Sequence, residues 1–244
     1  MSGGALLTCQ RVTRVFDGLV ANKDISVEVR SGEIVGLIGP NGAGKSTLFN
    51  LIAGAFPVTS GHIAFGGRDV TGLPAAARCH AGIARTYQVP RSFDSMSVLE
   101  NVIVGALVRY PRSRAARIKA LETLDYVGLA ERTGRPAGDL TPPERRRLEI
   151  ARAIATEPKL LLLDEVLTGL TPAESRSGVE LVRRIRESGI TVVMVEHVME
   201  VVMPLVDRAI VLNLGEVLAE GSPAEIVRDP AVIGAYLGDR RRAA

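Results

Sequence analysis

A buried strand followed at once by a glycine-rich loop is the feature that most constrains how this chain can fold. Residues 33–39 read EIVGLIG, a nearly continuous apolar run that stops at glycine, which is typical of a strand buried on both faces of a parallel sheet. Residues 39–47 read GPNGAGKST and satisfy the pattern G-x-x-x-x-G-K-[ST], and the helical stretch STLFNLIAG continues from there. This order of strand, loop and helix predicts a phosphate-binding loop at a helix N-terminus.

The residue types of the loop suit contacts with a nucleoside triphosphate. Its glycines let the backbone wrap closely with N–H groups pointing inward. The Lys45 ammonium can reach the β- and γ-phosphates, and the Ser46 hydroxyl can bind Mg²⁺. The plainer alternative is a glycine-rich turn with an exposed lysine. We predict that ATP binds along the loop, through Gly39, Asn41, Gly42, Ala43, Gly44, Lys45, Ser46 and Thr47.

Two further apolar runs extend the expected sheet. KLLLLDE at 159–165 and TVVMVEH at 191–197 alternate with helical stretches, which predicts βα units around one parallel sheet. Asp164 and Glu165 end the first run, at the carboxyl edge where open α/β sheets bind ligands. We expect Asp164 to hold Mg²⁺ through water and Glu165 to position or deprotonate the attacking water. An acidic pair after a strand is otherwise a solvated turn.

The remaining patterns indicate three structural parts. Residues 6–29 alternate and are rich in β-branched side chains, which predicts an antiparallel sheet. After residue 87 the strand signal disappears and helical periodicity takes over. We predict an α/β nucleotide-binding core with an antiparallel β-subdomain over 1–87 and 156–244, and an inserted helical subdomain over 88–155. Residues 209–221 are expected to form a hairpin.

Composition excludes several classes of protein. The 244 residues include no tryptophan and carry a net charge of +3 from arginines spread along helices, so neither stacking platforms for nucleic acid nor a basic binding face is indicated. Cys9 and Cys79 lie far apart without metal-ligand spacing. No apolar run approaches the roughly 20 residues that cross a bilayer. We expect a chain that is soluble on its own and binds no nucleic acid.

Together these segments resemble the ATP-binding subunit of ABC transporters, over about residues 6–238. Stretches such as GIARTYQVPRSFDSMSVLENV, LLLLDEVLTGLTPAE and VVMVEHVMEVVMPLVDRAIVLNLGEVLAEGSPAEIVRDPAVIGAYLG are similar to the importer branch that takes up branched-chain amino acids and related compounds. The resemblance implies a P-loop NTPase fold of the ABC ATPase type and hydrolysis of MgATP.

The resemblance also implies roles for residues that look ordinary by themselves. It implies that Phe16 stacks on adenine, that Gln88 binds Mg²⁺ and couples the helical subdomain to the site, and that His197 senses the γ-phosphate. It implies that the loop 169–172 faces a partner subunit. Without the resemblance, Phe16 is most simply a strand residue, Gln88 a loop amide and His197 a surface histidine.

For partners, the resemblance implies a peripheral subunit on the cytoplasmic face of the inner (plasma) membrane. It implies contact with integral permease subunits, through the groove beside residues 88–96, and indirect dependence on an extracytoplasmic substrate-binding protein. The alternatives are an ABC exporter, a non-transport ABC ATPase and a small-molecule P-loop kinase. The motif positions of Gln88, Glu165 and His197 count against a kinase, and a non-transport protein typically carries two cassettes or a long coiled-coil insert.

One segment departs from the family pattern. Where the family reads LSGGQ, whose amides contact the γ-phosphate of ATP held by the opposite subunit of a head-to-tail dimer, residues 140–144 read LTPPE. Two backbone donors are lost because proline has no N–H. Thr141 and Glu144 nevertheless have the spacing of a capping box that starts a helix. We predict a weak phosphate site here, and a heterodimer with a related cassette that carries an intact signature; alternatively, the branch tolerates variation at these positions.

Overall fold

The structure is a computed structural model that describes residues 4–196 and 199–242. Its described strands form two sheets, one in the order β2-β1-β4-β5 and one in the order β10-β9-β3-β8-β7-β6. Within the described residues, no helix is long and apolar enough to span a membrane.

The first sheet is antiparallel, as the alternating N-terminal pattern predicts. A two-residue turn, in which Asp17 and Gly18 have φ of 43° and 91°, joins its first two strands and matches their twist. The far edge is added by a later segment that the sequence did not reveal as strands. The bounds are β1 (Ala5–Phe16), β2 (Leu19–Arg30), β4 (Ser60–Phe65) and β5 (Arg68–Asp69).

The second sheet contains the three apolar runs as neighbouring parallel strands. Its last strand pairs antiparallel with the one before it, which confirms the predicted C-terminal hairpin. The bounds are β3 (Ile34–Ile38), β6 (Ile83–Arg85), β7 (Leu160–Asp164), β8 (Thr191–Val195), β9 (Arg208–Asn213) and β10 (Glu216–Gly221).

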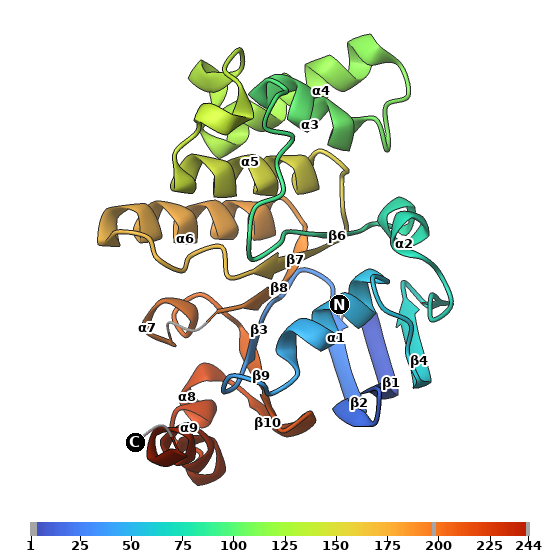
Figure 1. Cartoon of the computed structure of the whole chain (residues 1–244), viewed down its shortest axis with the longest axis vertical. Helices are drawn as coiled ribbons and strands as arrows, with labels where there is room; N and C mark the ends of the chain where they lie inside the picture. Colours follow the sequence, from blue (N-terminus) through green and yellow to red (C-terminus); the bar gives the residue numbers. More distant parts are fainter. Residues whose placement is uncertain (1–3, 197–198, 243–244) are drawn as a thin grey trace.

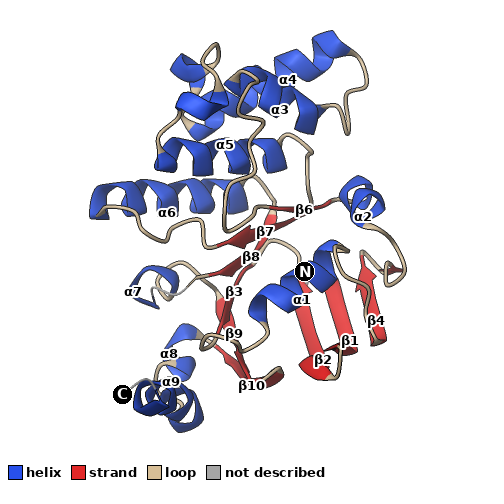
Figure 2. Cartoon of the chain, viewed as in Figure 1, coloured by secondary structure: helices blue, strands red, loops and turns tan. Residues whose placement is uncertain are grey.

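Successive residues of the parallel strands enter two different cores. In β7, Leu161 and Leu163 belong to the core that includes the helical segment, whereas Leu160 and Leu162 belong to the core shared with α1 (Lys45–Ala53) and the antiparallel sheet. The strands are buried on both faces for this reason, and their sequences are therefore apolar without alternation. Figure 2 shows α1 between the two sheets, with the helices of residues 98–154 beyond the opposite face of the second sheet.

Between residues 86 and 159 the chain is helical, with a single bridge between Ser97 and Pro136. Three helices pack together here and appear at the top of Figure 1 in green to yellow: α3 (Val98–Ala106), α4 (Ser113–Val127) and α5 (Pro142–Ile154). Their buried residues share one core with the sheet. The division into 88–155 and the two flanking segments stays a prediction.

The other helices connect or follow the strands of the second sheet. The nucleotide-loop helix α1 is followed by α2 (Ala75–Ala81), and α6 (Pro172–Glu187) joins β7 to β8. The remaining helices are α7 (Met199–Val202), α8 (Pro223–Ile226) and α9 (Pro230–Arg242). Together with the sheets they confirm the predicted P-loop α/β fold.

Candidate functional site

The loop between β3 and α1 has a backbone shape that excludes side chains at two positions. Gly39 and Gly44 have φ of 146° and 96°, values that glycine tolerates. A Cβ on Gly39 would lie 2.1 Å from the carbonyl oxygen of Leu212, and one on Gly44 would lie 2.5 Å from the amide nitrogen of Asn22. The glycines therefore let β3 turn sharply into α1, whose N-terminus carries no side-chain cap.

Lys45 is the first residue of α1, and its side chain turns back over the loop. Its ammonium donates to the carbonyl oxygens of Gly39 at 2.6 Å and Pro40 at 2.8 Å. Burial lowers the pKa of Lys45 from its ordinary value, while the charges of Glu165 and Asp164 act to raise it. A partly desolvated cation at a helix N-terminus suits an anionic ligand.

Glu165 follows β7 directly and contacts a residue from the start of the helical segment. The Gln88 side chain donates from Nε2 to Glu165 Oε2 at 2.7 Å. Glu165 itself has φ of 51°, a conformation that is uncommon outside glycine and clusters at functional sites. The fold thus brings together two residues that the sequence proposed for one site.

Arg85, the last residue of β6, is a member of the site that the sequence did not reveal. Its guanidinium forms an ion pair with Asp164 Oδ2 at 3.3 Å and donates to Asn50 Oδ1 at 2.6 Å. It also lies 4.5 Å from the ring centre of Tyr87. Arg85 therefore links the carboxylate at the end of β7 to α1 and to the segment that follows β6.

Phe16, at the end of β1, lies at the rim of the site. Its ring meets the ring of Phe56 edge-on, with 5.4 Å between centroids. The guanidinium of Arg14 lies 4.3 Å from the ring centre, so one face of Phe16 is already covered. The expected stacking of adenine on Phe16 stays a prediction.

Phe16, Lys45, Gln88 and Glu165 line one pocket of about 500 Å³, a size that suits a small-molecule ligand. It contains every predicted loop residue except Gly39, which lies beneath it as an acceptor for Lys45. Two predicted residues remain: Asp164 is buried beside Glu165, and His197 is outside the described residues. The lining is Phe16, Leu19, Val20, Ala21, residues 41–47, Gln88 and Glu165.

The donor set fits a magnesium ion that is held mainly by its ligand. Mg²⁺ usually takes one or two protein oxygens and completes its shell with phosphate oxygens and water. Accordingly, the described part of the chain has no cluster of three or more histidine, cysteine or carboxylate side chains that could hold a metal alone. Ser46 and Gln88 line the pocket beside the buried Asp164.

A family model described as ABC transporter matches residues 22–168, a span that includes the loop and the Asp164–Glu165 pair. This chain belongs to the ABC transporter family. It is an ATP-binding subunit with ATPase activity, as the resemblance predicted. A second family model, described as Branched-chain amino acid ATP-binding cassette transporter, matches residues 216–241, which run from β10 into α9.

Curated relatives cover almost the whole chain. The high-affinity branched-chain amino acid transport ATP-binding protein LivG of Salmonella typhimurium is 40% identical, over 96% of this chain and 98% of its own length. BraF of Pseudomonas aeruginosa, with the same description, is 37% identical over the same shares. The lipopolysaccharide export system ATP-binding protein LptB of Acidithiobacillus ferridurans is 39% identical, again over 96% and 98%.

Solved structures of ABC cassettes have the same fold. A nucleotide-free ATP-binding cassette from an ABC transporter superposes with a TM-score of 0.87 at 29% identity, covering 95% of this chain and 98% of that one. The ADP conformation of such a cassette superposes with the same score and identity, covering 96% and 99%. These likenesses confirm the predicted ABC ATPase fold.

The start of α5 is built like the starts of two other helices of this ABC subunit. In each, a threonine or serine takes the N-cap position and proline the first helical position, and a glutamate three residues after the cap accepts the backbone N–H and the hydroxyl of the capping residue. Helix α5 has a second proline at the next position. The three starts are Thr141–Glu144 of α5, Thr171–Glu174 of α6 and Ser222–Glu225 of α8.

The polar groups at the start of α5 form hydrogen bonds with one another. The backbone N–H and the hydroxyl of Thr141 both donate to Glu144 Oε2, at 2.9 and 3.0 Å. Arg132 donates to Glu144 Oε1 at 2.8 Å. Its hydrogen bond and the Thr141 N–H lower the pKa of Glu144 to about 2, so a carboxylate charge persists here at neutral pH.

A groove of about 350 Å³ separates α1 and α2 from the helical segment. Small residues of α2 and of the end of α1 form one wall, and Val104, Gly105 and Val108 form the other. Its floor includes Arg85, Tyr87 and the α5 residue Glu149. The groove therefore begins where the chain leaves β6 and enters the segment that carries Gln88.

Proposed function

We propose that this chain energises an importer of branched-chain amino acids or related compounds. The observation that carries the proposal is the match of residues 216–241 to the branched-chain family model, which adds to the LivG and BraF relatives. A lipopolysaccharide export protein is similarly related, so export is the second candidate. Uptake of labelled leucine, isoleucine and valine by cells with the wild-type subunit or Glu165→Gln tests import. Unchanged uptake in the variant would contradict it.

In the proposed site, the loop 39–47 and the N-terminus of α1 bind the phosphates of ATP. Backbone N–H groups and the Lys45 ammonium neutralise phosphate oxygens, and Phe16 contacts the adenine at the rim. Ser46, Gln88 and, through water, Asp164 hold Mg²⁺, which draws negative charge away from the β- and γ-phosphates.

Glu165 acts on the attacking water in this proposal. Its carboxylate lies at the end of β7, on the pocket wall, within hydrogen-bond distance of Gln88. A carboxylate so placed can accept a proton from water or hold the water in line. His197, at the end of the neighbouring apolar run, is proposed to contact the γ-phosphate.

The permease is proposed to dock in the groove between α2 and the helical segment. The groove is mostly apolar, and its floor reaches Arg85 and Tyr87. Arg85 contacts Asp164, and Tyr87 directly precedes Gln88. A permease helix seated there could shift Gln88 relative to Glu165. This docking would hold the chain at the cytoplasmic face of the inner membrane, with a substrate-binding protein acting from the other side.

The partner cassette is proposed to be a different chain. In a head-to-tail dimer, the start of α5 would face ATP held by the other subunit. The prolines supply no N–H, and the Glu144 carboxylate would repel a triphosphate at short range. A partner with an intact signature would complete the site at this chain's own loop.

Purified protein can test this pairing directly. We expect the chain alone to bind ATP and hydrolyse it slowly, and to hydrolyse it fast only with a second cassette and the permease. Rapid hydrolysis by the chain alone would contradict the heterodimer, whereas absence of ATP binding would contradict the assignment of the loop.

A further inference from the structure

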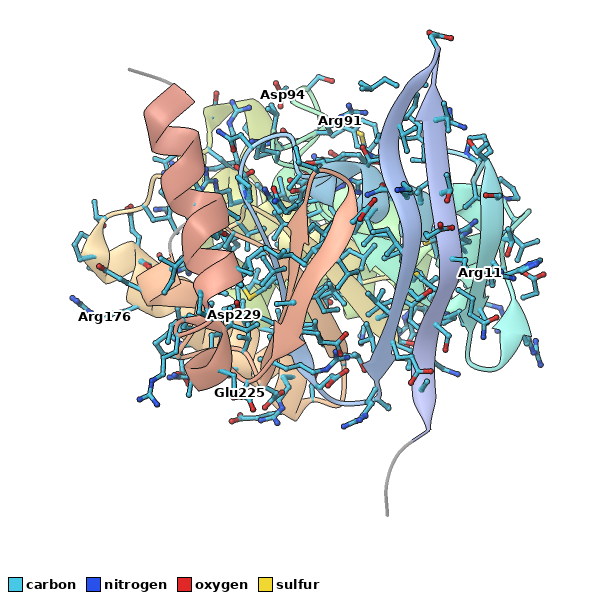
Figure 3. All side chains as sticks on the ribbon, turned by 90° about the horizontal axis from the view of Figure 1, so that it is seen from below. Arg11, Arg91, Asp94, Arg176, Glu225 and Asp229 are labelled. Carbon is cyan, nitrogen blue, oxygen red and sulfur yellow. The ribbon has the colours of Figure 1, made fainter. Side chains whose placement is uncertain are left out.

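Three charged side chains of α5 face the segment of residues 87–94, which carries Gln88. They stand at the spacing i, i+4 and i+7, which places them along one face of the helix. Figure 3 labels two residues of the segment, Arg91 and Asp94, at one edge of the molecule. The three α5 residues are Arg145, Glu149 and Arg152.

Glu149 stands in the middle of this face and is only 7% exposed. Its Oε1 accepts the backbone N–H of Tyr87 at 3.1 Å, and the backbone N–H of Arg91 faces the same carboxylate and acts to lower its pKa. Gln88 lies between these two points. Hydrogen bonds to an ionised acceptor are about twice as strong as neutral ones, so one side chain holds both ends of the short loop that carries Gln88.

The neighbouring α5 side chains complete the attachment. Arg152 donates to the carbonyl oxygen of Arg91, so the two peptide groups of that residue are both held by α5. Arg145 pairs with Asp94 at 3.3 Å. The ring of Tyr87 lies 4.5 Å from the guanidinium of Arg91. The segment is therefore fixed to the helix by its backbone and by charge pairs.

We propose that Glu149 is a positioning residue whose carboxylate holds the Gln88 loop against α5 and so sets the contact of Gln88 with Glu165. Because α5 begins at the LTPPE segment, a displacement of this helix is transmitted to Gln88 through the same carboxylate. The consequence for catalysis rests on the proposed function, whereas the attachment itself is a property of the single chain.

The surroundings make this attachment sensitive to pH. Burial raises the pKa of Glu149 to about 7, against the lowering effect of the two backbone N–H groups and the nearby arginines. Opening of the loop would expose Glu149 and restore its ordinary pKa, so the attachment is tighter in mild acid and loosens as the carboxyl ionises above about pH 7. The titratable and charged groups that face Glu149 or line the same groove floor are Cys79 of α2, Arg85 of β6, Tyr87 and Arg91 of the segment, and Arg152 of α5.

Hydrogen exchange of the full-length chain, followed by mass spectrometry of peptides covering residues 86–94, tests the proposal. We expect these amides to exchange about tenfold faster at about pH 8 than at about pH 6, after correction for intrinsic rates. Glu149→Gln, whose side chain does not ionise, should show no such difference between the two pH values. The matched control Glu180→Gln, an exposed glutamate of α6, should behave as wild type.

Equal corrected exchange of the wild type at the two pH values would overturn the proposal, as would a wild-type difference between the two pH values in Glu149→Gln. The comparison of the wild type at the two pH values requires no variant, so it tests the proposal even if Glu149→Gln fails to fold. ATP binding, measured on the same samples, separates this outcome from a failure of the proposed function. In the assembled transporter, the ATPase activity of Glu149→Gln should lose the wild-type dependence on pH near 7.

Discussion

Two helices of this molecule begin at segments that we propose face ATP phosphates, and they begin in opposite ways. Helix α1 follows a glycine loop and has no side-chain cap, so its N–H groups face a pocket. Helix α5 begins with Thr141 and two prolines, and Glu144 takes up the cap's own N–H and hydroxyl. The N–H groups at the start of α1 are available to a ligand, whereas Thr141 and Glu144 at the start of α5 hydrogen-bond to each other.

The difference shows that a helix N-terminus is an anion site only when its donors are free. The macrodipole is similar for both helices, but the start of α5 contains two residues without N–H and a carboxylate whose pKa falls to about 2. Helix α8 starts in the same capped manner with Ser222 and Glu225, the latter labelled in Figure 3. The start of α5 is therefore similar to that of α8, where a glutamate also accepts the N–H and the hydroxyl of the capping residue.

The largest expected effect lies at the α1 end. Glu165→Gln should retain MgATP affinity and reduce turnover of the assembled transporter on the order of a thousandfold, because the water loses its base. Lys45→Ala should instead weaken ATP binding itself. Titration with labelled ATP and steady-state ATPase assays separate the two variants, with Glu180→Gln as a control. Equal turnover by wild type and Glu165→Gln would remove that residue from its role.

A second effect distinguishes the start of α5 from its middle. The pKa of Glu149 is raised from 4.5 to about 7 in the folded chain, so its contribution to stability is complete below about pH 4.5 and is lost as the pH rises through about 7. The shift corresponds to about 3 kcal/mol. Urea unfolding at several pH values should show this loss in wild type and a clearly smaller loss in Glu149→Gln, in which Glu196, whose pKa burial also raises, still contributes.

The pKa of Glu144 is lowered, so its contribution to stability depends on pH in the opposite direction to that of Glu149. Unfolding experiments can therefore distinguish the two carboxylates. Its depressed pKa contributes stability above about pH 4.5 that is lost as the pH falls toward about 2. A slope between about pH 5 and 7 that is as large in Glu149→Gln as in wild type would contradict the assignment of that slope to Glu149.

Replacing the two prolines at the start of α5 would restore backbone N–H donors there, as at the start of α1. Pro142→Gly with Pro143→Gly should raise ATP hydrolysis by the isolated chain by up to roughly a hundredfold, because two N–H groups become available to a phosphate. Pro223→Gly at the start of α8 is the matched control and should leave the rate unchanged. No gain in the double variant would indicate that the prolines do not limit hydrolysis.

The smallest effect concerns the caps alone. Thr141→Ala and Ser222→Ala should each destabilise the chain by about 1 kcal/mol, since each removes a helix cap. Neither should change the affinity of the isolated chain for ATP. Denaturant unfolding together with ATP titration measures both quantities, and a loss of ATP affinity confined to Thr141→Ala would show that the α5 start takes part in nucleotide binding.

Much of the fold follows from local pattern. The run LLLLD predicts a strand buried on both faces, and the structure shows why, because its successive leucines enter two cores. The cap of α5 was predictable as well, since Thr141 and Glu144 interact within one turn. The strand Ser60–Phe65 was not, because its place beside β1 is set by pairing between distant segments.

Some residues of the site were likewise predictable from the sequence, and others were not. The phosphate loop and the Asp164–Glu165 pair have recognisable spacing, whereas the importance of Arg85 depends on β6 lying beside β7. Glu149 sits in a helix of charged residues, RRRLEIAR, and its sequence has the appearance of a solvated face. Only the packing of residues 87–94 against α5 buries this carboxylate and gives it two backbone partners.

The central claim is that the two helix ends contribute unequally to ATP hydrolysis in the assembled transporter. The most direct test removes the catalytic glutamate from one cassette at a time in the complex of this chain, its partner cassette and the permease, and measures steady-state ATPase activity. Loss of Glu165 should be far more damaging than loss of the equivalent glutamate of the partner, because only the site at this chain's loop faces an intact signature. Equal losses would contradict the account and leave the two prolines as nothing more than a way to start a helix.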